Sequence, residues 1–421
     1  MRYFRRALCA SVPLLSALNY QPKDRCLDNN DALICHDTDY QDTIKSCSTL
    51  IKQAKLSCGT PGVAISVHVN GEKVWEDGFG YADVENAVLC TPSTVMRIAS
   101  ISKLITSVIA MKMYQNSKLD LDQNISAICE DMPEFSIKGE PKEITTRQLL
   151  NHTSGIRHYI GADDSDSGCP EFYSSEHFNT VKDALAVFAN DDLQFEPGSD
   201  FCYTTFGYSV LSYVIETVSE KGFPKVLKDT FNQFGMFNTY CEFNDELILN
   251  RAKFYQFENN KLKNSPYVDN SIKWAGGGLL STVKDLSQLG NIFLYCLQSN
   301  DPDNYLSQDT LQIMTKRYNE FNEFDHNRHY SLGVRVQKDM IESSVEVLPA
   351  SFHHTGGAVG AVSNLFILPT EPEHESDAPR GVVVVILCNL ESGGPVIRLA
   401  REIAVRFRDA VCSCEECDIE Q

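Results

Sequence analysis

The sequence predicts an α/β fold in which one antiparallel sheet, flanked by helices, carries an inserted helical lobe. Strand patterns stand at both ends of the chain: residues 63–69 alternate in polarity, and residues 381–387 are almost entirely valine, isoleucine and leucine. Helical patterns dominate the middle, from about residue 97 to 270. We therefore expect the two ends to pair into one sheet and the middle to form a second lobe, with a cleft between them.

The chain opens with a predicted helix and a hairpin. Apolar residues at roughly helical spacing predict a helix over residues 42–54. The strand pattern at 63–69 is separated from a second one at 73–79 by Asn70-Gly71, and this dipeptide is a strong signal for a two-residue hairpin turn. The order of elements at this end is therefore helix, strand, strand.

The remaining elements are divided by turn residues. Glycine and proline at Gly155, Pro197-Gly198 and Gly222 mark the ends of helices in the middle region. Helices are expected over 104–115, 146–150, 180–190 and 208–220, strands over 360–368 and 381–387, and a final amphipathic helix over 395–411.

Three segments follow from this pattern. Residues 1–37 form a leader and linker, because arginines and then an apolar stretch at the N-terminus are typical of a secretory signal or a mitochondrial transit peptide. Residues 411–421 form an acidic tail rich in cysteine, for which a disulfide or an unstructured tail is favoured over a metal site. Between them lies one domain, 38–410, with an α/β lobe (38–96 and 271–410) and a helical lobe (97–270).

Composition excludes several classes of function. The 421 residues, 43% of them hydrophobic, are enough for a large core. With a net charge of −20 and no basic patch, nucleic-acid binding is not expected. No apolar run after the N-terminus is long enough to span a bilayer. We expect no cofactor and no metal site. Of the 15 cysteines, 14 remain without Cys9, and this even number leaves secretion open.

The tetrapeptide Ser100-Ile101-Ser102-Lys103 is the most informative chemical signal. Residues three apart share one face of a helix, so the Lys103 amine reaches the Ser100 hydroxyl. A serine hydroxyl becomes a nucleophile when a neighbouring base takes its proton. Lysine can act as that base if burial lowers its pKa, and the flanking residues are apolar. The start of the helix also favours a developing negative charge.

Two further segments supply candidate groups. Tyr203 stands between a Pro-Gly turn and a helix, where its phenol can carry a proton if a nearby cation lowers its pKa. The glycines after His354-Thr355 let the backbone pack close to a ligand. An N–H there, together with that of Ser100, would form an oxyanion hole with two donors. Each segment alone also fits ordinary packing or a glycine-rich turn.

Five motifs occur in a recognisable order along roughly residues 40–410. They are Ser100-x-x-Lys103, Leu-Leu-x-His-Thr-Ser-Gly at 149–155, Tyr203-Thr204-Thr205, Trp-Ala-Gly-Gly-Gly at 274–278, and His354-Thr355-Gly356-Gly357. In these motifs the chain resembles the serine β-lactamase and penicillin-binding-protein superfamily, and within it the animal mitochondrial β-lactamase-like serine proteases. The resemblance implies a β-lactamase/transpeptidase-like fold.

The resemblance also implies roles for residues of three motifs, whereas the motifs at 149–155 and 274–278 are assigned no chemical role. Ser100 would be the acylated nucleophile, Lys103 its base, and Tyr203 the carrier of a proton to the leaving group. The substrate would lie beside the segment His354-Thr355-Gly356-Gly357. The N–H groups of Ser100 and Gly357 would form the oxyanion hole.

Two departures from bacterial relatives bear on the substrate. Thr205 stands where many of them have asparagine, and His354 where many have lysine. Histidine is mostly neutral at pH 7, so recognition of a substrate carboxylate is not expected. No carboxylate can be assigned as the base for deacylation, so β-lactam turnover is not expected either. We expect a neutral or larger peptide or ester.

Three functions remain in view. The first is a serine hydrolase of the peptidase type, linked by resemblance to mitochondrial lipid metabolism. The second is an esterase or amidase for small acyl substrates, and the third is a scaffold that is not catalytic but keeps a hydrolase fold. The resemblance favours the mitochondrion, secretion is the alternative, and self-association into a homo-oligomer is left open.

Overall fold

The computed structural model describes residues 40–160, 169–318, 328–337, 340–342, 346–348, 350–371 and 379–419. The leader and linker expected over 1–37 lie outside these ranges. The described residues all belong to the unit that begins at Thr38.

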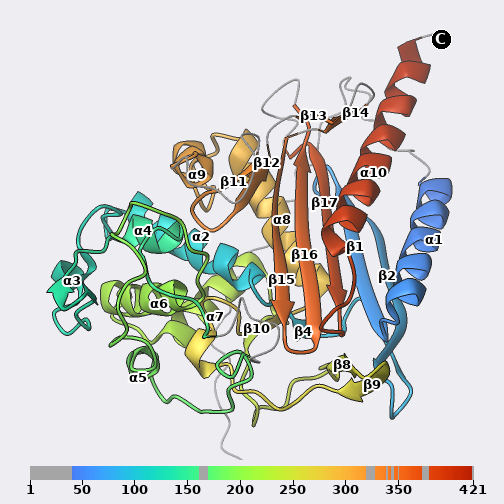
Figure 1. The fold of residues 1–421 in the computed structure, drawn as a ribbon. Helices are drawn as coiled ribbons and strands as arrows, with labels where there is room; N and C mark the ends of the chain where they lie inside the picture. Colours follow the sequence, from blue (N-terminus) through green and yellow to red (C-terminus); the bar gives the residue numbers. More distant parts are fainter. Residues whose placement is uncertain are drawn as a thin grey trace, which may run out of the picture. The chain divides into compact units, whose positions relative to one another are not determined.

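One sheet of eight strands organises this unit (Figure 1). All its neighbouring strands run antiparallel. β1 pairs with β17, placing Ile65 opposite Ile386, which confirms that the two ends of the chain form one sheet. In spatial order the strands are β11 (Arg328–Tyr330), β12 (Arg335–Gln337), β15 (Ser351–Ala358), β16 (Ala361–Pro369), β17 (Gly381–Cys388), β1 (Gly62–Val69), β2 (Glu72–Asp83) and β3 (Val88–Leu89).

Helices cover both faces of the sheet (Figure 1). α1 (Gln41–Cys58) and α10 (Val396–Ile419) lie together on one face, and α8 (Val283–Gln298) contacts β1, β16 and β17 from the other. The remaining helices are α2 (Ile101–Gln115), α3 (Ile125–Ile128), α4 (Thr146–Leu150), α5 (Val181–Leu185), α6 (Phe206–Ser219), α7 (Phe223–Phe234), α9 (Gln308–Thr315) and the 3₁₀ helix η1 (Ser271–Lys273).

Short strands complete the fold. β4 leads directly into the segment that carries Ser100, and it pairs with β10 in a small sheet of three strands. That sheet consists of β4 (Met96–Arg97), β10 (Leu279–Ser281) and β7 (Tyr240–Cys241). Separate pairs are formed by β5 (Ser136–Ile137) with β6 (Glu140–Pro141), β8 (Tyr255–Glu258) with β9 (Lys261–Asn264), and β13 (Met340–Glu342) with β14 (Glu346–Leu348).

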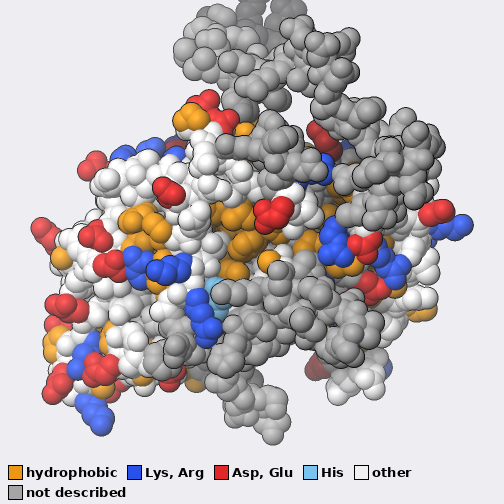
Figure 2. Space-filling model, turned by 90° about the horizontal axis from the view of Figure 1, so that it is seen from above, with side chains coloured by type: hydrophobic (Ala, Val, Ile, Leu, Met, Phe, Trp, Pro, Cys, Tyr) orange, Lys and Arg blue, Asp and Glu red, His pale blue; other side chains and the backbone are white. Residues whose placement is uncertain are grey.

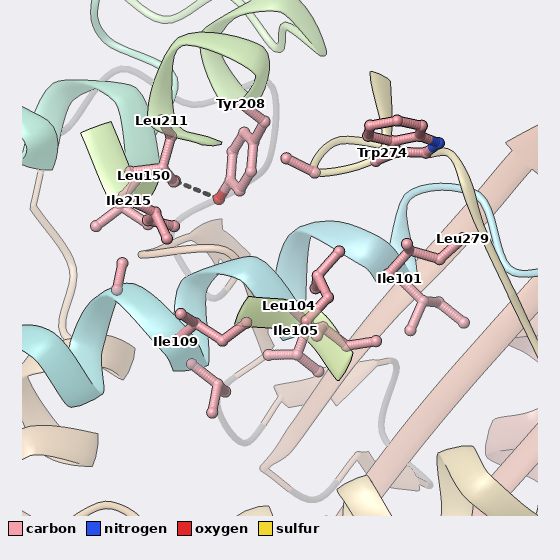
Figure 3. Packing of buried hydrophobic residues seen from close by; sticks show 14 of the residues in the cluster. Ile101, Leu104, Ile105, Ile109, Leu150, Tyr208, Leu211, Ile215, Trp274 and Leu279 are labelled. Atoms are coloured by element: carbon pink, nitrogen blue, oxygen red, sulfur yellow. Dashed lines mark hydrogen bonds between the residues drawn. The ribbon is translucent and has the colours of Figure 1, made fainter. Parts of the chain in front are cut away.

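Helix α2 is the centre of the larger hydrophobic core (Figure 3). Its Ile101, Leu104, Ile105 and Ile109 side chains pack among residues of α4, α6 and β10. Every residue of α2 from Ile101 to Met111 is buried. The Tyr208 hydroxyl donates a hydrogen bond to the Leu150 carbonyl at 2.9 Å, which ties α6 to α4. A second core fills the space between the sheet and the α1–α10 layer. Burial of this extent fixes the start of α2, where Ser100 stands.

Several helices differ from the sequence prediction. Helices α7, α8 and α9 were not predicted. α8 contains Gly290, where an added Cβ would lie 2.5 Å from Val383, so glycine allows this helix to pack close to the sheet. α5 is shorter than the predicted 180–190. α10 continues past Val411, where the tail was expected to begin, because residues 412–419 contain no glycine or proline to stop a helix.

The face shown in Figure 2 is mixed in character. Acidic and basic side chains lie beside one another around it, which fits solvated surface charge, and hydrophobic side chains gather near its centre. No helix within the described ranges is both long and apolar enough to cross a bilayer.

Candidate active site

Ser100 stands where β4 turns into α2, at the N-terminal end of that helix. The residue before it, Ala99, has a φ of 48°, a left-handed conformation that is uncommon for a residue with a side chain and that often marks a functional turn. β15 passes close behind this turn. A Cβ added to Gly356 would lie 2.4 Å from the Ile98 carbonyl oxygen, so only glycine allows this approach.

Lys103 is completely buried beneath Ser100. Its Nζ lies 3.3 Å from Ser100 Oγ, 3.3 Å from Thr205 Oγ1 and 2.5 Å from the Gly276 carbonyl oxygen. Burial holds the pKa of this amine well below its usual value, and the positive charges of Lys273 and Arg335 lower it further. A neutral amine has two N–H groups, which can donate hydrogen bonds to Thr205 Oγ1 and to the Gly276 carbonyl oxygen. Its one lone pair is then free to accept the proton of the Ser100 hydroxyl.

Tyr203 forms the next side of the site. The Lys103 Nζ lies 4.7 Å from the centre of its ring. Burial raises the pKa of Tyr203 to about 12, although the Ser100 hydroxyl and the Arg335 charge act in the opposite direction. The sequence suggested that a nearby cation could lower the pKa of Tyr203. This is wrong, because the effect of burial outweighs that of the Arg335 charge. The phenol stays protonated at neutral pH and can act as a proton donor.

β15 forms one wall of a cavity in front of Ser100. Thr355, Gly357 and Ala358 border this cavity, whereas His354 and Gly356 do not. Successive residues of a strand face opposite sides, which explains why Thr355 and Gly357 border the cavity while His354 and Gly356 do not. Ala358, the last residue of β15, borders the cavity although it does not follow this alternation. The structure thus brings Ser100, Lys103, Tyr203, Thr355 and Gly357 together.

His354 lies behind this wall and is 1% exposed. Its Nδ1 lies 2.7 Å from the Thr355 carbonyl oxygen and therefore donates a hydrogen bond to it. Its Nε2, 3.1 Å from the Tyr330 hydroxyl, accepts one. Burial lowers the pKa of His354 well below its usual value, so the ring is neutral. It differs from the sequence expectation in supporting the wall from behind without bordering the cavity.

The cavity has a volume of about 420 Å³. Its described lining contains no aspartate or glutamate, but it does contain Lys273 and Arg335. The complete set comprises Ser100, His158, Tyr159, Cys169, Phe172, Tyr203, Thr205, Lys273, Gly276, Gly277, Arg335, Thr355, Gly357 and Ala358.

Sequence reasoning missed His158, Lys273 and Arg335. His158 and Lys273 stand close to the two motifs that were given no chemical role, and that proximity was the available signal. Burial lowers the pKa of His158 to about 3, so its ring is neutral. Its Nδ1 accepts a hydrogen bond from the Thr205 N–H at 3.3 Å, which leaves Nε2 as an N–H donor.

An ion-pair cluster around the buried Glu242 lies at the end of β4, the strand that leads to Ser100. The Glu242 carboxylate accepts hydrogen bonds from Arg97, Arg251 and Asn270. Arg97, which ends β4, also donates to the Val359 carbonyl oxygen at 2.6 Å. The cluster therefore ties the strand that leads to Ser100 to the turn that follows Gly357.

The described residues contain no group of three or more His, Cys, Asp or Glu side chains placed to hold a metal ion. The cysteine cluster of the expected tail, Cys412, Cys414 and Cys417, has side chains outside the described part of the chain.

Known proteins are similar to this chain in both sequence and fold. The beta-lactamase family matches residues 41–406. The mitochondrial serine beta-lactamase-like protein LACTB of Mus musculus is 36% identical over 86% of this chain and 80% of its own length. For the Homo sapiens protein of the same name the figures are 36%, 86% and 79%.

Solved structures agree on the fold. The octameric penicillin-binding protein homologue from Pyrococcus abyssi superposes with a TM-score of 0.66 at 23% identity, covering 85% of this chain and 76% of its own. A D-stereospecific amidohydrolase from Streptomyces sp. superposes with a TM-score of 0.66 at 21% identity, covering 84% of this chain and 96% of its own.

Proposed function

The chain belongs to the beta-lactamase family and has its serine hydrolase fold, and on this premise we propose that it is a serine peptidase that forms an acyl-enzyme on Ser100. The observation that carries the proposal is the buried Lys103 amine, 3.3 Å from the Ser100 hydroxyl and with a strongly lowered pKa. An amine in that state can take the proton that Ser100 must lose.

Acylation would proceed in two steps. Lys103 takes the hydroxyl proton while Ser100 Oγ attacks the carbonyl carbon of the substrate, and the negative charge forms on the carbonyl oxygen. Backbone N–H groups of Ser100 and Gly357 would stabilise that oxyanion, and one such donor is worth about 3–4 kcal/mol. The carbon–nitrogen bond then breaks, Tyr203 protonates the leaving amine, and the proton on Lys103 passes back to Tyr203.

Deacylation needs a base for water. No aspartate or glutamate lies in the described lining of the cavity. After the proton has left, Lys103 is again a neutral amine beneath the ester oxygen of Ser100. We assign it the second role as well: it accepts a proton from the attacking water and returns it to Ser100 Oγ as the ester bond breaks.

A second candidate is an esterase or amidase for small acyl compounds. The cavity volume of about 420 Å³ favours it, because this lies in the range of small-molecule sites, about 300–1,000 Å³. The scaffold hypothesis has less support. A scaffold has no use for an unpaired buried amine beside a hydroxyl, and such burial costs stability.

The location and setting are proposed from the relatives. We propose a mitochondrial protein, because the LACTB proteins that are 36% identical are named as mitochondrial. A link to lipid metabolism rests on the same resemblance. Self-association is proposed by analogy with the octameric Pyrococcus abyssi homologue.

Substrate preference separates the two enzymatic candidates. Fluorogenic peptide amides and 4-nitrophenyl acetate and butyrate would be compared with wild-type protein, Ser100→Ala, and Ser126→Ala as an exposed serine control. We expect peptide hydrolysis that Ser100→Ala abolishes and Ser126→Ala retains. A strong preference for the esters would favour the second candidate, and full activity in folded Ser100→Ala would overturn both.

A further inference from the structure

The second lysine of the cavity, Lys273, is buried with no acidic partner among the residues that the structure describes. It is 6% exposed, and within the described ranges no aspartate or glutamate forms an ion pair with it. Its Nζ donates one hydrogen bond, to the Phe172 carbonyl oxygen at 3.2 Å. An ammonium group has three N–H donors, so two remain for whatever occupies the cavity that Lys273 lines.

This arrangement is costly unless the cavity holds an anion. A buried charge without a partner costs several kcal/mol in proteins. The rings of Tyr159 and Phe172, whose centres lie 5.3 and 5.1 Å from Nζ, offset part of that cost, since each cation–π contact is worth about 0.5–2 kcal/mol. The Glu242 carboxylate acts on Lys273 through its charge, but its hydrogen bonds go to Arg97 and Arg251.

Arg335 is a second cationic side chain in the described lining, with its Cζ 5.9 Å from the centre of the Tyr203 ring. The described lining contains no acidic side chain that would repel an anion. Lys273 comes from η1, on the side of Tyr159 and Phe172, and not from β15, so it marks a subsite away from the strand that borders Ser100.

We propose that Lys273 is a specificity residue that anchors a carboxylate on the substrate. The proposal rests on the proposed function and names its substrate class: acyl compounds or peptides with a negative charge near the bond that is cleaved. It replaces the expectation of a neutral substrate, which considered only the neutral His354. The cation is supplied from a different wall of the cavity.

A pair of matched esters tests this. The 4-nitrophenyl monoester of glutaric acid is anionic in its acyl part, and the 4-nitrophenyl ester of monomethyl glutarate is its neutral equivalent. We expect wild-type protein to favour the anionic ester by about tenfold or more in kcat/KM, as for a hydrogen bond to a charged group. The ratio should fall toward one in Lys273→Met, persist in Lys273→Arg, and be unchanged in Lys118→Met, an exposed lysine control. Equal rates for the two esters in wild-type protein, or an undiminished ratio in folded Lys273→Met, would overturn the proposal.

A binding measurement keeps this separate from catalysis. Glutarate should raise the melting temperature of wild-type protein, whereas neutral glutaramide should not, and Lys273→Met should lose the effect. Stabilisation by inorganic phosphate but not by glutarate would overturn the assignment of a carboxylate. If glutarate binds through Lys273 and Ser100 is inert toward both esters, the proposed function fails while the anion subsite stands. If both esters are hydrolysed through Ser100 without a charge preference, only the subsite fails.

Discussion

Two regions next to the nucleophile treat buried charge in opposite ways. At the end of β4, Glu242 neutralises Arg97 and Arg251 in a cluster of hydrogen bonds. Beneath Ser100 and in the cavity in front of it, Lys103 and Lys273 are buried with no acidic partner among the described residues. A buried charge with a partner of opposite sign stabilises the structure, whereas one without such a partner has a shifted pKa or can bind a ligand of opposite charge. We therefore assign a structural role to the ion-pair cluster and a catalytic or binding role to the residues around the front cavity.

The largest expected effect comes from removing the base. Lys103→Met should lower kcat/KM by about 10²–10⁴-fold, the usual contribution of a general base, because nothing else described beside Ser100 can take its proton. The melting temperature should change little, because the loss of three buried hydrogen bonds is offset by the removal of a buried amine that has no acidic partner among the described residues. Steady-state kinetics and a thermal melt check both. Activity within a few-fold of wild type would break the assignment of chemistry to the front cavity.

The opposite pattern is expected in the ion-pair cluster at the end of β4. Glu242→Gln leaves two guanidinium groups without their charge partner, so the free energy of unfolding should fall by about 3–5 kcal/mol. Urea denaturation measures it. Glu258→Gln, in the exposed pair with Lys263, is the matched control and should cost about 0–1 kcal/mol. Equal losses in the two variants would remove the distinction between the regions.

Tyr203→Phe sharpens the account of the front cavity. The phenol remains protonated at neutral pH, so its loss removes a donor to the leaving group. We expect kcat for peptide amides to fall by about 10²-fold. Esters of 4-nitrophenol should be affected much less, since their leaving group departs without a proton. An equal loss for amides and esters would instead indicate that the ring only positions Lys103.

The smallest effect is a pH dependence of the preference for the anionic ester. Burial and the Arg97 charge lower the pKa of Lys273 to about 8, while Glu242 and Cys169 act to raise it. The amine is therefore charged below pH 8 and neutral above it. The ratio of kcat/KM for anionic and neutral esters should be high at pH 7 and fall as the pH rises through about 8. Lys273→Arg should keep the ratio high to pH 10, and a flat wild-type ratio would contradict the charge argument.

Local signals in the sequence predicted what local geometry decides. The i, i+3 spacing of Ser100 and Lys103 required only one helix turn, and Asn70-Gly71 required only one hairpin. The cavity wall depended on tertiary structure. Arg97 and Glu242 are 145 residues apart, and no local pattern links them. Which side of β15 faces the cavity follows from strand register, so the position of His354 could not be predicted from its motif.

The central claim is that Lys103 activates Ser100, and covalent labelling tests it most directly. Purified protein would be treated with a fluorophosphonate, and the adduct mapped by mass spectrometry in wild type, Ser100→Ala and Lys103→Met. The account predicts a single adduct on the peptide containing Ser100, absent from Ser100→Ala and formed at least about 10²-fold more slowly in Lys103→Met. Folded wild-type protein without an adduct, or labelling of Ser100 at the same rate in Lys103→Met, would contradict it.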